Sequence, residues 1–378
     1  MRMDRNDSVG DAALAATALH KYAYARGPSV VTVAQLPQFD EFVDVRSEGE
    51  FAEDHIPGAL SCPVLTNEER ARVGTLYKQV SSFEAKKIGA ALVSANIARH
   101  LQERFHDRPR EWRPLVYCWR GGSRSGALAQ VMHQIGWRVG QLEGGYRAYR
   151  RQVIADLDVL PGLYRWRAVC GLTGSGKSRL LRALQACGGQ VLDLEALAAH
   201  RGSVLGNLPD QPQPGQKMFE SSIWNALRQF STSRPVYVEA ESKKIGALRV
   251  PDALIAAMWA SPCVVVEAPL QARVALLKAE YEHFMMEPAT LIAKLECLSG
   301  LYGRTVVGEW KALAAGARWD ELTEDLLKRH YDPAYTRSTL RHYPRLADAR
   351  SLHVVATSDA EFERLARECM AEERAATR

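Results

Sequence analysis

A glycine-rich segment near the middle of the chain limits the possible folds more than any other sequence feature. Residues 171–178 read Gly-Leu-Thr-Gly-Ser-Gly-Lys-Ser; the apolar stretch 167–170 precedes them, and a stretch with helical periodicity, 179–187, follows. A strand that runs into a glycine turn and then into a helix is typical of parallel α/β sheets, because each crossover helix covers one face of the sheet. The segment therefore predicts an α/β domain built around a parallel sheet.

This glycine loop (residues 171–178) also predicts a phosphate site. It matches the Walker A pattern in full, and the residues that we expect to surround phosphate are Gly171, Gly174, Ser175, Gly176, Lys177 and Ser178. Backbone N–H groups would enclose a diphosphate, Lys177 would neutralise its oxygens, and the Ser178 hydroxyl would reach a magnesium ion. The pattern specifies a diphosphate and not a base, so nucleotides and other diphosphate esters both fit it.

Acidic residues near the glycine loop are candidates for orienting a metal ion or its bound water. The strand expected at 235–239 leads into Glu-Ala-Glu, where an aspartate is usual, and a second acidic pair lies at the end of the strand expected at 190–194. The four candidates are Asp193, Glu195, Glu239 and Glu241. Each of them could instead cap a helix, and the sequence does not rank them.

A second anion-binding segment lies upstream, where residues 118–125 read Cys-Trp-Arg-Gly-Gly-Ser-Arg-Ser. We expect Cys118 at the carboxyl end of a buried strand, with its thiolate stabilised by backbone N–H groups, by the start of the next helix and by Arg120 and Arg124. These three residues are the predicted catalytic residues. Because the Cys-x5-Arg spacing also occurs in cysteine phosphatases, the loop alone leaves both sulfur transfer and phosphatase chemistry open.

Composition indicates the compartment and the kind of partner. The seven cysteines are scattered without a Cys-x-x-Cys pair, so we expect neither a zinc site nor a disulfide framework, and a reducing cytoplasm fits. No stretch approaches the ~18 apolar residues of a membrane span, and the mixed charges of the first twenty residues do not resemble a signal peptide. We therefore expect no membrane partner, whereas the net charge of +5 favours a polyanion without specifying which.

The length and the order of the sequence signals predict two α/β domains. A chain of 378 residues exceeds what one hydrophobic core usually supports, and strand and helix signals alternate from residue 30 onward. The predicted parts are an N-terminal extension at 1–28, a parallel-sheet domain at 29–155, a P-loop domain at 156–350 with a helical part near 270–330, and a C-terminal strand and helix tail at 351–378.

Four blocks in the first predicted domain lie at 44–51, 55–59, 118–125 and 143–146. In order and spacing they resemble the rhodanese (sulfurtransferase) homology domain, over about residues 29–155. The resemblance implies that Cys118 carries a persulfide or its selenium counterpart, and we interpret Asp44 and Arg46 as an ion pair beneath the loop. The loop from 118 to 124 is longer than in many sulfurtransferases, which favours a phosphate-bearing donor such as selenophosphate.

Further blocks extend a resemblance over about residues 30–340; they lie at 63–70, 74–79, 193–203, 239–246 and 331–335. With them the chain resembles the bacterial tRNA 2-selenouridine synthase family. Membership implies that geranyl diphosphate prenylates the sulfur of wobble 2-thiouridine in tRNA, and that selenium from selenophosphate then displaces the geranylthio group to give 2-selenouridine. It also implies that the glycine loop binds geranyl diphosphate, with no need for ATP hydrolysis.

A basic, tyrosine-containing segment at 328–345 predicts a contact with tRNA. Its arginines would pair with phosphates, and its tyrosines would stack on unpaired anticodon bases. Together with basic residues of two family blocks, the candidates are Arg201, Lys243, Lys244, Tyr331, Tyr335, Arg337, Arg341 and Arg345. A basic helix that packs on its domain through its tyrosines explains the same segment equally well.

Two other functions compete with this interpretation. One is an NTP-dependent rhodanese-type sulfurtransferase, or a cysteine phosphatase, with a regulatory P-loop domain. The other is a non-catalytic binding module whose Walker A domain senses nucleotide. The presence of Cys118 together with both arginines argues against the binding module.

Overall fold

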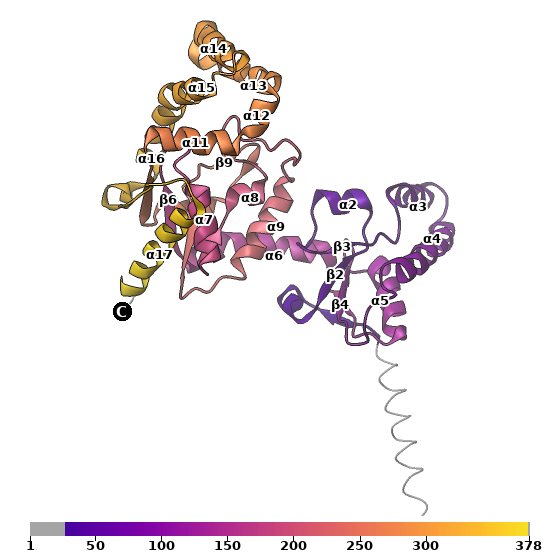
Figure 1. Ribbon diagram of the computed structural model, residues 1–378. Coiled ribbons are helices and arrows are strands. Elements are labelled where there is room, and N and C mark those ends of the chain that lie inside the picture. The colour runs from indigo at the N-terminus through magenta and orange to yellow at the C-terminus, as the bar shows by residue number, and fades with distance from the viewer. Residues whose placement is uncertain (1–26, 377–378) are drawn as a thin grey trace, which may run out of the picture. The chain divides into compact units, whose positions relative to one another are not determined.

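The computed structural model describes residues 27–376, so nearly all of the predicted N-terminal extension lies outside the described residues. The chain divides into two compact units, Met1–Ile154 and Ala155–Arg378, and the division falls within helix α6 (Gly145–Val159). Each unit contains a five-stranded parallel sheet with helices packed on it (Figure 1). The predicted α/β fold class is therefore confirmed.

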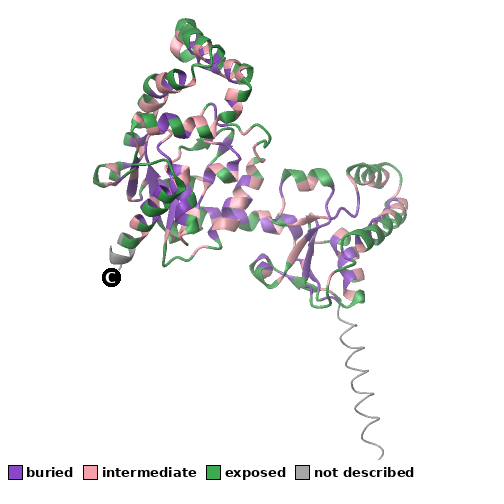
Figure 2. Ribbon diagram, viewed as in Figure 1, coloured by how far each residue is buried: buried purple, intermediate pink, exposed green. Residues whose placement is uncertain are grey.

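The sheet of the first unit has the strand order β1-β5-β4-β2-β3. Its strands are β1 (Ser29–Val31), β2 (Glu41–Asp44), β3 (Leu60–Ser61), β4 (Pro114–Tyr117) and β5 (Gly140–Leu142). All four residues of β4 are buried, as expected for a central strand of a parallel sheet covered on both faces (Figure 2). The accompanying helices are η1 (Val33–Gln38), α2 (Glu48–Glu53), α3 (Asn67–Gln79), α4 (Ser82–Glu103) and α5 (Ser123–Ile135).

The sheet of the second unit has the order β12-β11-β6-β8-β7. Its strands are β6 (Arg165–Cys170), β7 (Gln190–Leu192), β8 (Pro235–Glu239), β11 (Cys263–Glu267) and β12 (Arg350–His353), and a separate antiparallel pair consists of β9 (Lys244–Ile245) and β10 (Leu248–Arg249). The C-terminal segment completes this unit, because β12 pairs with β11 and helix α17 (Asp359–Ala376) shares a core cluster with helix α7 (Lys177–Ala186).

The remaining helices of the second unit cover the sheet and extend beyond it. They are η2 (Leu160–Leu163), α8 (Leu194–Ala198), α9 (Gln216–Leu227), α10 (Asp252–Trp259), α11 (Leu270–Glu280), α12 (Glu282–Met286), α13 (Pro288–Leu295), η3 (Glu296–Leu298), α14 (Ser299–Ala315), α15 (Trp319–Leu326), η4 (Leu327–Tyr331), α16 (Asp332–His342) and η5 (Pro344–Asp348). We call α11 to α15 the helical extension; it has a core of its own around Trp310 (Figure 1). Among the helices between residues 27 and 376, none combines the length and apolar character required to cross a membrane.

Candidate functional sites

The loop that carries Cys118 connects the end of β4 to the start of α5 and is held from behind by the beginning of α6. The backbone N–H groups of Tyr146 and Arg147 donate to the carbonyl oxygens of Cys118 (2.8 Å) and Trp119 (3.1 Å). Gly145 has φ +56°, and a Cβ atom there would lie 2.2 Å from the Cys118 oxygen. Residues 143 and 144 form a turn after β5, Gly145 and Tyr146 begin α6, and only glycine allows this close packing.

The surroundings of Cys118 favour its thiolate form. The side chain is 4% exposed, and burial alone would raise the pKa of the thiol. Hydrogen bonds from the Ser125 hydroxyl, 3.2 Å from the sulfur, and from the backbone N–H groups of Ser125, Arg120 and Gly122 outweigh burial, so the pKa lies below its usual value. A lowered pKa increases the fraction of thiolate, which is the nucleophilic form of cysteine.

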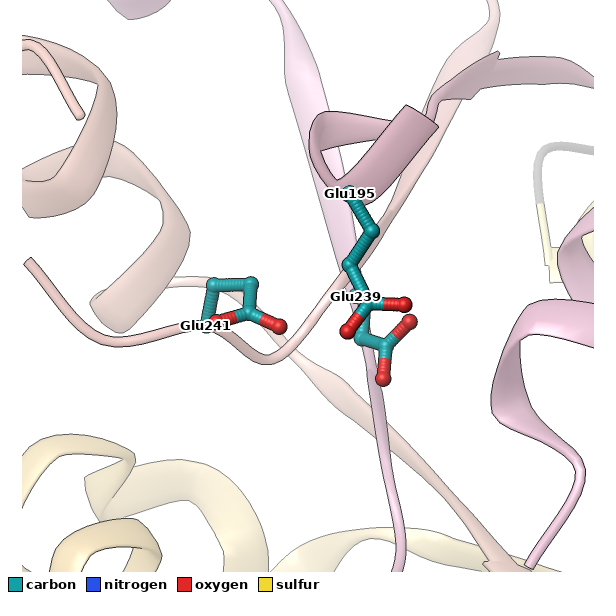
Figure 3. Close-up of side chains that lie close together, drawn as sticks. All are labelled: Glu195, Glu239 and Glu241. Atoms are coloured by element: carbon teal, nitrogen blue, oxygen red, sulfur yellow. The ribbon is translucent and has the colours of Figure 1, made fainter. Parts of the chain in front are cut away.

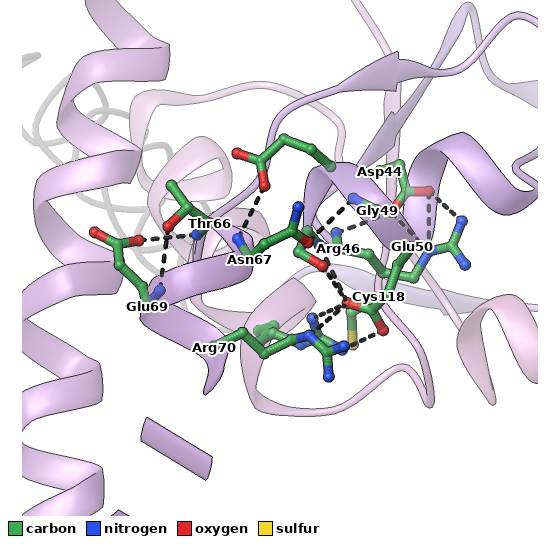
Figure 4. Close-up of polar contacts among 12 residues, drawn as sticks. Asp44, Arg46, Gly49, Glu50, Thr66, Asn67, Glu69, Arg70 and Cys118 are labelled. Carbon is green, nitrogen blue, oxygen red and sulfur yellow. Dashed lines mark hydrogen bonds and ion pairs between the residues drawn. The ribbon is translucent and has the colours of Figure 1, made fainter. Parts of the chain in front are cut away.

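The arginines of the loop are placed differently from the sequence-based expectation that they would stabilise the thiolate. Arg124 donates to Glu50 at 2.9 Å, and Arg70 lies 3.4 Å from the same carboxylate (Figure 4). Burial would raise the pKa of Glu50, but these contacts, chiefly the hydrogen bond from Arg124, lower it to about 2. Arg120 is exposed. The largest contributions to the thiolate therefore come from Ser125 and the backbone, and Arg124 instead joins the loop to α2.

A buried ion pair lies beneath the loop, as the sequence suggested for Asp44 and Arg46. Their side chains are 2.6 Å apart, and both residues are almost fully buried. The Arg46 guanidinium also donates to the Asp54 carbonyl oxygen at 2.6 Å and lies 4.0 Å from the centre of the Tyr146 ring. The Tyr146 hydroxyl in turn donates to the Asp54 carboxylate at 2.8 Å. Through Asp54, which lies between two blocks, this network joins the blocks 44–51 and 143–146, and it has a structural role.

The glycine loop connects β6 to α7 in the second unit. Lys177 is buried, and its ammonium group donates to the Gly171 oxygen at 3.0 Å and lies 3.4 Å from Glu239. The N–H group of Gly171 donates to the hydroxyl of Tyr335 at 2.9 Å. Gly176 has φ +93°, and a Cβ atom there would lie 2.4 Å from the Phe362 ring, so α17 packs directly against the loop.

Three of the four acidic candidates meet beside this loop. Glu195, Glu239 and Glu241 each offer an oxygen, and these oxygens lie within 4.8 Å of one another (Figure 3). The Ser178 hydroxyl lies 3.2 Å from Glu239 and 3.4 Å from Glu195. Hard oxygen donors of this kind suit Mg²⁺. The fourth candidate, Asp193, caps α8 by accepting from the N–H of Ala196 at 2.8 Å.

The three carboxylates are unfavourably crowded when all are charged. Burial, reinforced by charge repulsion from Glu239, raises the pKa of Glu241 to about 8, although Lys177 opposes the shift. Burial and repulsion also raise the pKa values of Glu195 and Glu239. A divalent cation at this position would relieve the repulsion, and Glu195, Glu239, Glu241 and Ser178 are the residues that would hold it.

A cavity of about 600 Å³ lies over the glycine loop and the carboxylates. Its wall includes Gly174, Gly176, Lys177 and Ser178 of the loop as well as all four acidic candidates. Ser175 is 1% exposed and lies behind this wall. The loop and the carboxylates therefore face one space, which is large enough for a diphosphate ester.

Comparison with known proteins places these two sites in one family. A model of the rhodanese-like domain matches residues 29–152, and a model of the tRNA 2-selenouridine synthase AAA domain matches residues 165–297. A tRNA 2-selenouridine synthase from Bdellovibrio bacteriovorus is 31% identical over 349 residues, which cover 80% of this chain and 89% of that protein. This chain belongs to the tRNA 2-selenouridine synthase family.

Other members of the tRNA 2-selenouridine synthase family align over shorter regions. The relative from Hydrogenovibrio crunogenus is 34% identical over 65% of this chain and 72% of its own length. The relative from Nitrosomonas europaea is 36% identical over 63% of each chain. The alignments with the Nitrosomonas europaea and Marinobacter nauticus proteins thus span less than two thirds of those relatives, 63% and 66%.

The segment expected to contact tRNA in this family member forms η4, α16 and η5. Arg337, Arg341 and Arg345 are exposed. The tyrosines are placed differently from the arginines: Tyr331 and Tyr335 line the cavity over the glycine loop, and Tyr343 is 3% exposed. The arginines are therefore the residues of this segment that an RNA backbone can reach.

The three basic candidates outside that segment have separate surroundings. Arg201 lines the cavity, with its guanidinium 4.7 Å from the centre of the Tyr281 ring. Lys243 lies 5.5 Å from the centre of the Trp259 ring, and Lys244 is exposed in β9. Only Arg201 thus lies beside the glycine loop.

Sequence reasoning missed several residues that position the two sites. Glu50 lies in the block 44–51, where the Ser47-x-x-Glu50 spacing predicts only a helix cap, and nothing local indicates its contact with Arg124. Arg273 of α11 donates to the Thr173 oxygen at 2.8 Å and pairs with Asp332 of α16, so it joins the glycine loop to the tyrosine-bearing helix. A single arginine in a helical stretch carries no such information in the sequence.

Proposed function

We propose that this chain converts wobble 2-thiouridine of tRNA to 2-selenouridine through an S-geranyl intermediate, using geranyl diphosphate and selenophosphate. Its relatives are named tRNA 2-selenouridine synthases. The observation that carries the proposal is that one chain combines a thiol of lowered pKa in a cradle of backbone N–H groups with a lysine and carboxylate site for a diphosphate. Prenyl transfer and selenium transfer require one site of each kind.

The glycine loop is the proposed site of prenyl transfer. The thiocarbonyl sulfur of the base attacks C1 of the geranyl group, the C–O bond breaks, and pyrophosphate leaves while the base loses its N3 proton. Lys177 is placed to stabilise the charge that develops on pyrophosphate, which the loop N–H groups would also bind. Magnesium held by Ser178 and the carboxylates would supply further charge neutralisation. No nucleotide hydrolysis enters this reaction.

The Cys118 loop is the proposed site for selenophosphate. Its N–H groups can hold the tetrahedral phosphate beside the Cys118 thiolate. The thiolate attacks phosphorus and the P–Se bond breaks; the released selenide then attacks C2 of the base, from which the geranylthiolate leaves, and water cleaves the S–P bond to free phosphate. Prenylation prepares the base for this step, because the sulfur on C2 is a poor leaving group until it carries the geranyl group and can leave as a thiol. The two sites would therefore act in a fixed order on one nucleotide.

Nucleoside analysis tests the proposal. The purified chain is incubated with 2-thiouridine-containing tRNA, Mg²⁺, geranyl diphosphate and selenophosphate, and the digested tRNA is examined by mass spectrometry. We expect 2-selenouridine from the natural chain, unchanged 2-thiouridine from Lys177→Ala, and accumulated S-geranyl-2-thiouridine from Cys118→Ser. Lys311→Ala, which removes a surface lysine paired with Glu296, is the control and should keep full activity.

A parallel reaction separates the competing function. If ATP or GTP replaces geranyl diphosphate and supports modification, the glycine loop serves a nucleotide-dependent sulfurtransferase and the proposal fails. Prenyl transfer retained by Lys177→Ala would likewise remove the glycine loop from the mechanism.

A further inference from the structure

A second cavity, lined almost entirely by apolar side chains, lies within the helical extension. It has a volume of about 80 Å³. Its inner wall comes from α12, α13 and α15, and the residues that form it include Phe284, Met285, Leu291, Trp319, Leu322 and Leu326. Protein cores are usually packed without such voids, so an apolar space at this position calls for an occupant.

This apolar cavity adjoins the cavity over the glycine loop. Five residues line both spaces: Thr173, Ser203, Leu277, Tyr281 and Tyr331. Thr173 belongs to the glycine loop itself, and Leu277 lies one turn after the loop contact of Arg273. A ligand whose diphosphate is bound by the loop can therefore extend past these residues into the apolar space.

Three of the polar side chains beside the apolar cavity have partners. The hydroxyls of Ser203 and Tyr281 lie 3.4 Å apart, and Lys278 pairs with Asp320 at 2.7 Å. The Tyr281 ring stacks parallel to Phe284, with centroids 5.8 Å apart. An occupant thus meets hydrocarbon and ring faces, which suit an uncharged chain without hydrogen-bonding groups.

We propose that the apolar cavity binds the branched end of the isoprenoid chain whose diphosphate is held by the glycine loop, and that its inner wall limits the length of that chain. This inference rests on the proposed function. The volume of the cavity suits the end of an isoprenoid chain but not the whole chain. An apolar cavity of ~150 Å³ accommodates benzene, so about half that volume accommodates a few carbons. The rest of a ten-carbon chain lies along Leu277, Tyr281 and Tyr331.

Binding measurements with the full chain, Mg²⁺ and ligands of different length test this inference. Each buried methylene is worth about fourfold in affinity, so geranyl diphosphate should bind on the order of 10- to 100-fold more tightly than pyrophosphate. Dimethylallyl diphosphate, whose five carbons would lie along Leu277, Tyr281 and Tyr331, should bind between pyrophosphate and geranyl diphosphate in affinity. Isothermal titration gives the three dissociation constants without any catalytic step.

Two adjacent methionines provide a matched pair of variants. Met285 is half-buried and lines the cavity, whereas Met286 is 77% exposed and does not. Met285→Trp should fill the space and weaken geranyl diphosphate about tenfold or more, with the affinities for pyrophosphate and dimethylallyl diphosphate unchanged. Met286→Trp should change none of the three. Leu291→Ala enlarges the cavity and should improve the binding of farnesyl diphosphate relative to geranyl diphosphate.

The outcomes separate this inference from the proposed function. Suppose that geranyl diphosphate binds more tightly than pyrophosphate, but Met285→Trp does not weaken it and Leu291→Ala does not improve the affinity for farnesyl diphosphate. The isoprenoid chain then lies elsewhere, and this inference is overturned while the proposed function stands. If geranyl diphosphate binds no more tightly than pyrophosphate, or if Lys177→Ala binds it normally, the prenyl-diphosphate assignment of the glycine loop fails and the inference fails with it.

Discussion

The hydroxyl of Ser125 lies 3.2 Å from the sulfur of Cys118, one turn into the helix that begins beside the loop. It also lies 3.1 Å from the Gly122 carbonyl oxygen, and the Gln141 amide donates to it at 3.0 Å. Ser125 is fully buried, so no water competes for this hydroxyl. A neutral side chain thus contributes to the thiolate stabilisation that the sequence analysis assigned to backbone N–H groups, the helix start and two arginines.

Replacing Ser125 by alanine should therefore raise the pKa of Cys118. A hydrogen bond to a charged group contributes about 1.5–3 kcal/mol, and one pKa unit corresponds to about 1.4 kcal/mol, so we expect a rise of about one unit or more. At a pH below the pKa of Cys118 in the natural chain the thiolate fraction then falls, and alkylation of Cys118 by iodoacetamide should slow about tenfold. Mass spectrometry of the Cys118 peptide across a pH series measures this.

Ser123→Ala is the control for that experiment, because Ser123 lies in the same turn but is exposed. An alkylation profile of Ser125→Ala that coincides with the natural chain would contradict the assigned role. Reactivity of the other cysteines does not interfere, since each peptide is followed separately.

The buried pair of Asp44 and Arg46 predicts a large loss of stability when one partner is removed. Arg46→Met removes the guanidinium from the Asp54 carbonyl oxygen and from the Asp44 carboxylate, which keeps only the backbone N–H of residue 46 from this pair. Removing one member of a buried pair typically costs about 3–5 kcal/mol. Hydrogen exchange of peptides from the first unit, followed against urea concentration, should show this loss.

Arg113→Met provides the contrast for the buried pair, because Arg113 pairs with Asp40 at the surface. Exposed pairs contribute little, so this variant should exchange like the natural chain. Equal behaviour of the two variants would mean that the Asp44 pair does not stabilise the first unit.

The carboxylate cluster predicts a dependence of stability on pH and Mg²⁺. The pKa of Glu241 is raised from 4.5 to about 8 in the folded chain. Between pH 4.5 and about pH 8 the folded chain therefore keeps a proton on Glu241 that the unfolded chain has lost. The free energy of unfolding without metal should therefore fall as the pH rises from about 5 to 8. Magnesium requires the deprotonated carboxylates, so it should raise the melting temperature more at pH 8 than at pH 6.

Thermal unfolding of Glu241→Gln checks this linkage. The variant cannot lose the proton, so its melting temperature without metal should depend less on pH and its response to Mg²⁺ should shrink. A full Mg²⁺ response in this variant would place the metal elsewhere. Glu267→Gln, at the end of β11 and outside the cluster, is the matched control.

Local sequence was sufficient to predict the two loops, because the strand, turn and helix that form each one are consecutive. Strand β8 has the predicted bounds, and β6 and β7 differ by only two residues at one end. Helix α3 was missed because none of its residues is buried, so the apolar periodicity that would reveal it is absent.

The arrangement of the acidic residues could not be predicted, because it depends on the order of strands in the sheet. Glu195 and Glu241 approach one another since β8 lies between β6 and β7, and no local pattern encodes that order. The tyrosines of residues 328–345 show the same limit. The sequence placed Tyr335 beside arginines as an RNA contact, whereas the fold turns its ring toward Lys177, 5.2 Å from the ring centre.

The exposed arginines of α16 predict an electrostatic contact with tRNA. Arg337 and Arg341 are four residues apart and therefore lie on one face of the helix. If each neutralises a phosphate, replacing one by alanine should weaken tRNA binding and reduce the slope of log affinity against log salt concentration by about one. Filter binding of tRNA at salt concentrations from about 50 to about 300 mM measures both the affinity and the slope. The control is Arg367→Ala, because Arg367 lies in α17 and pairs with Glu363. If the slope is unchanged in Arg337→Ala and Arg341→Ala, α16 does not bind the RNA backbone. An equal reduction of the slope in Arg367→Ala would lead to the same conclusion.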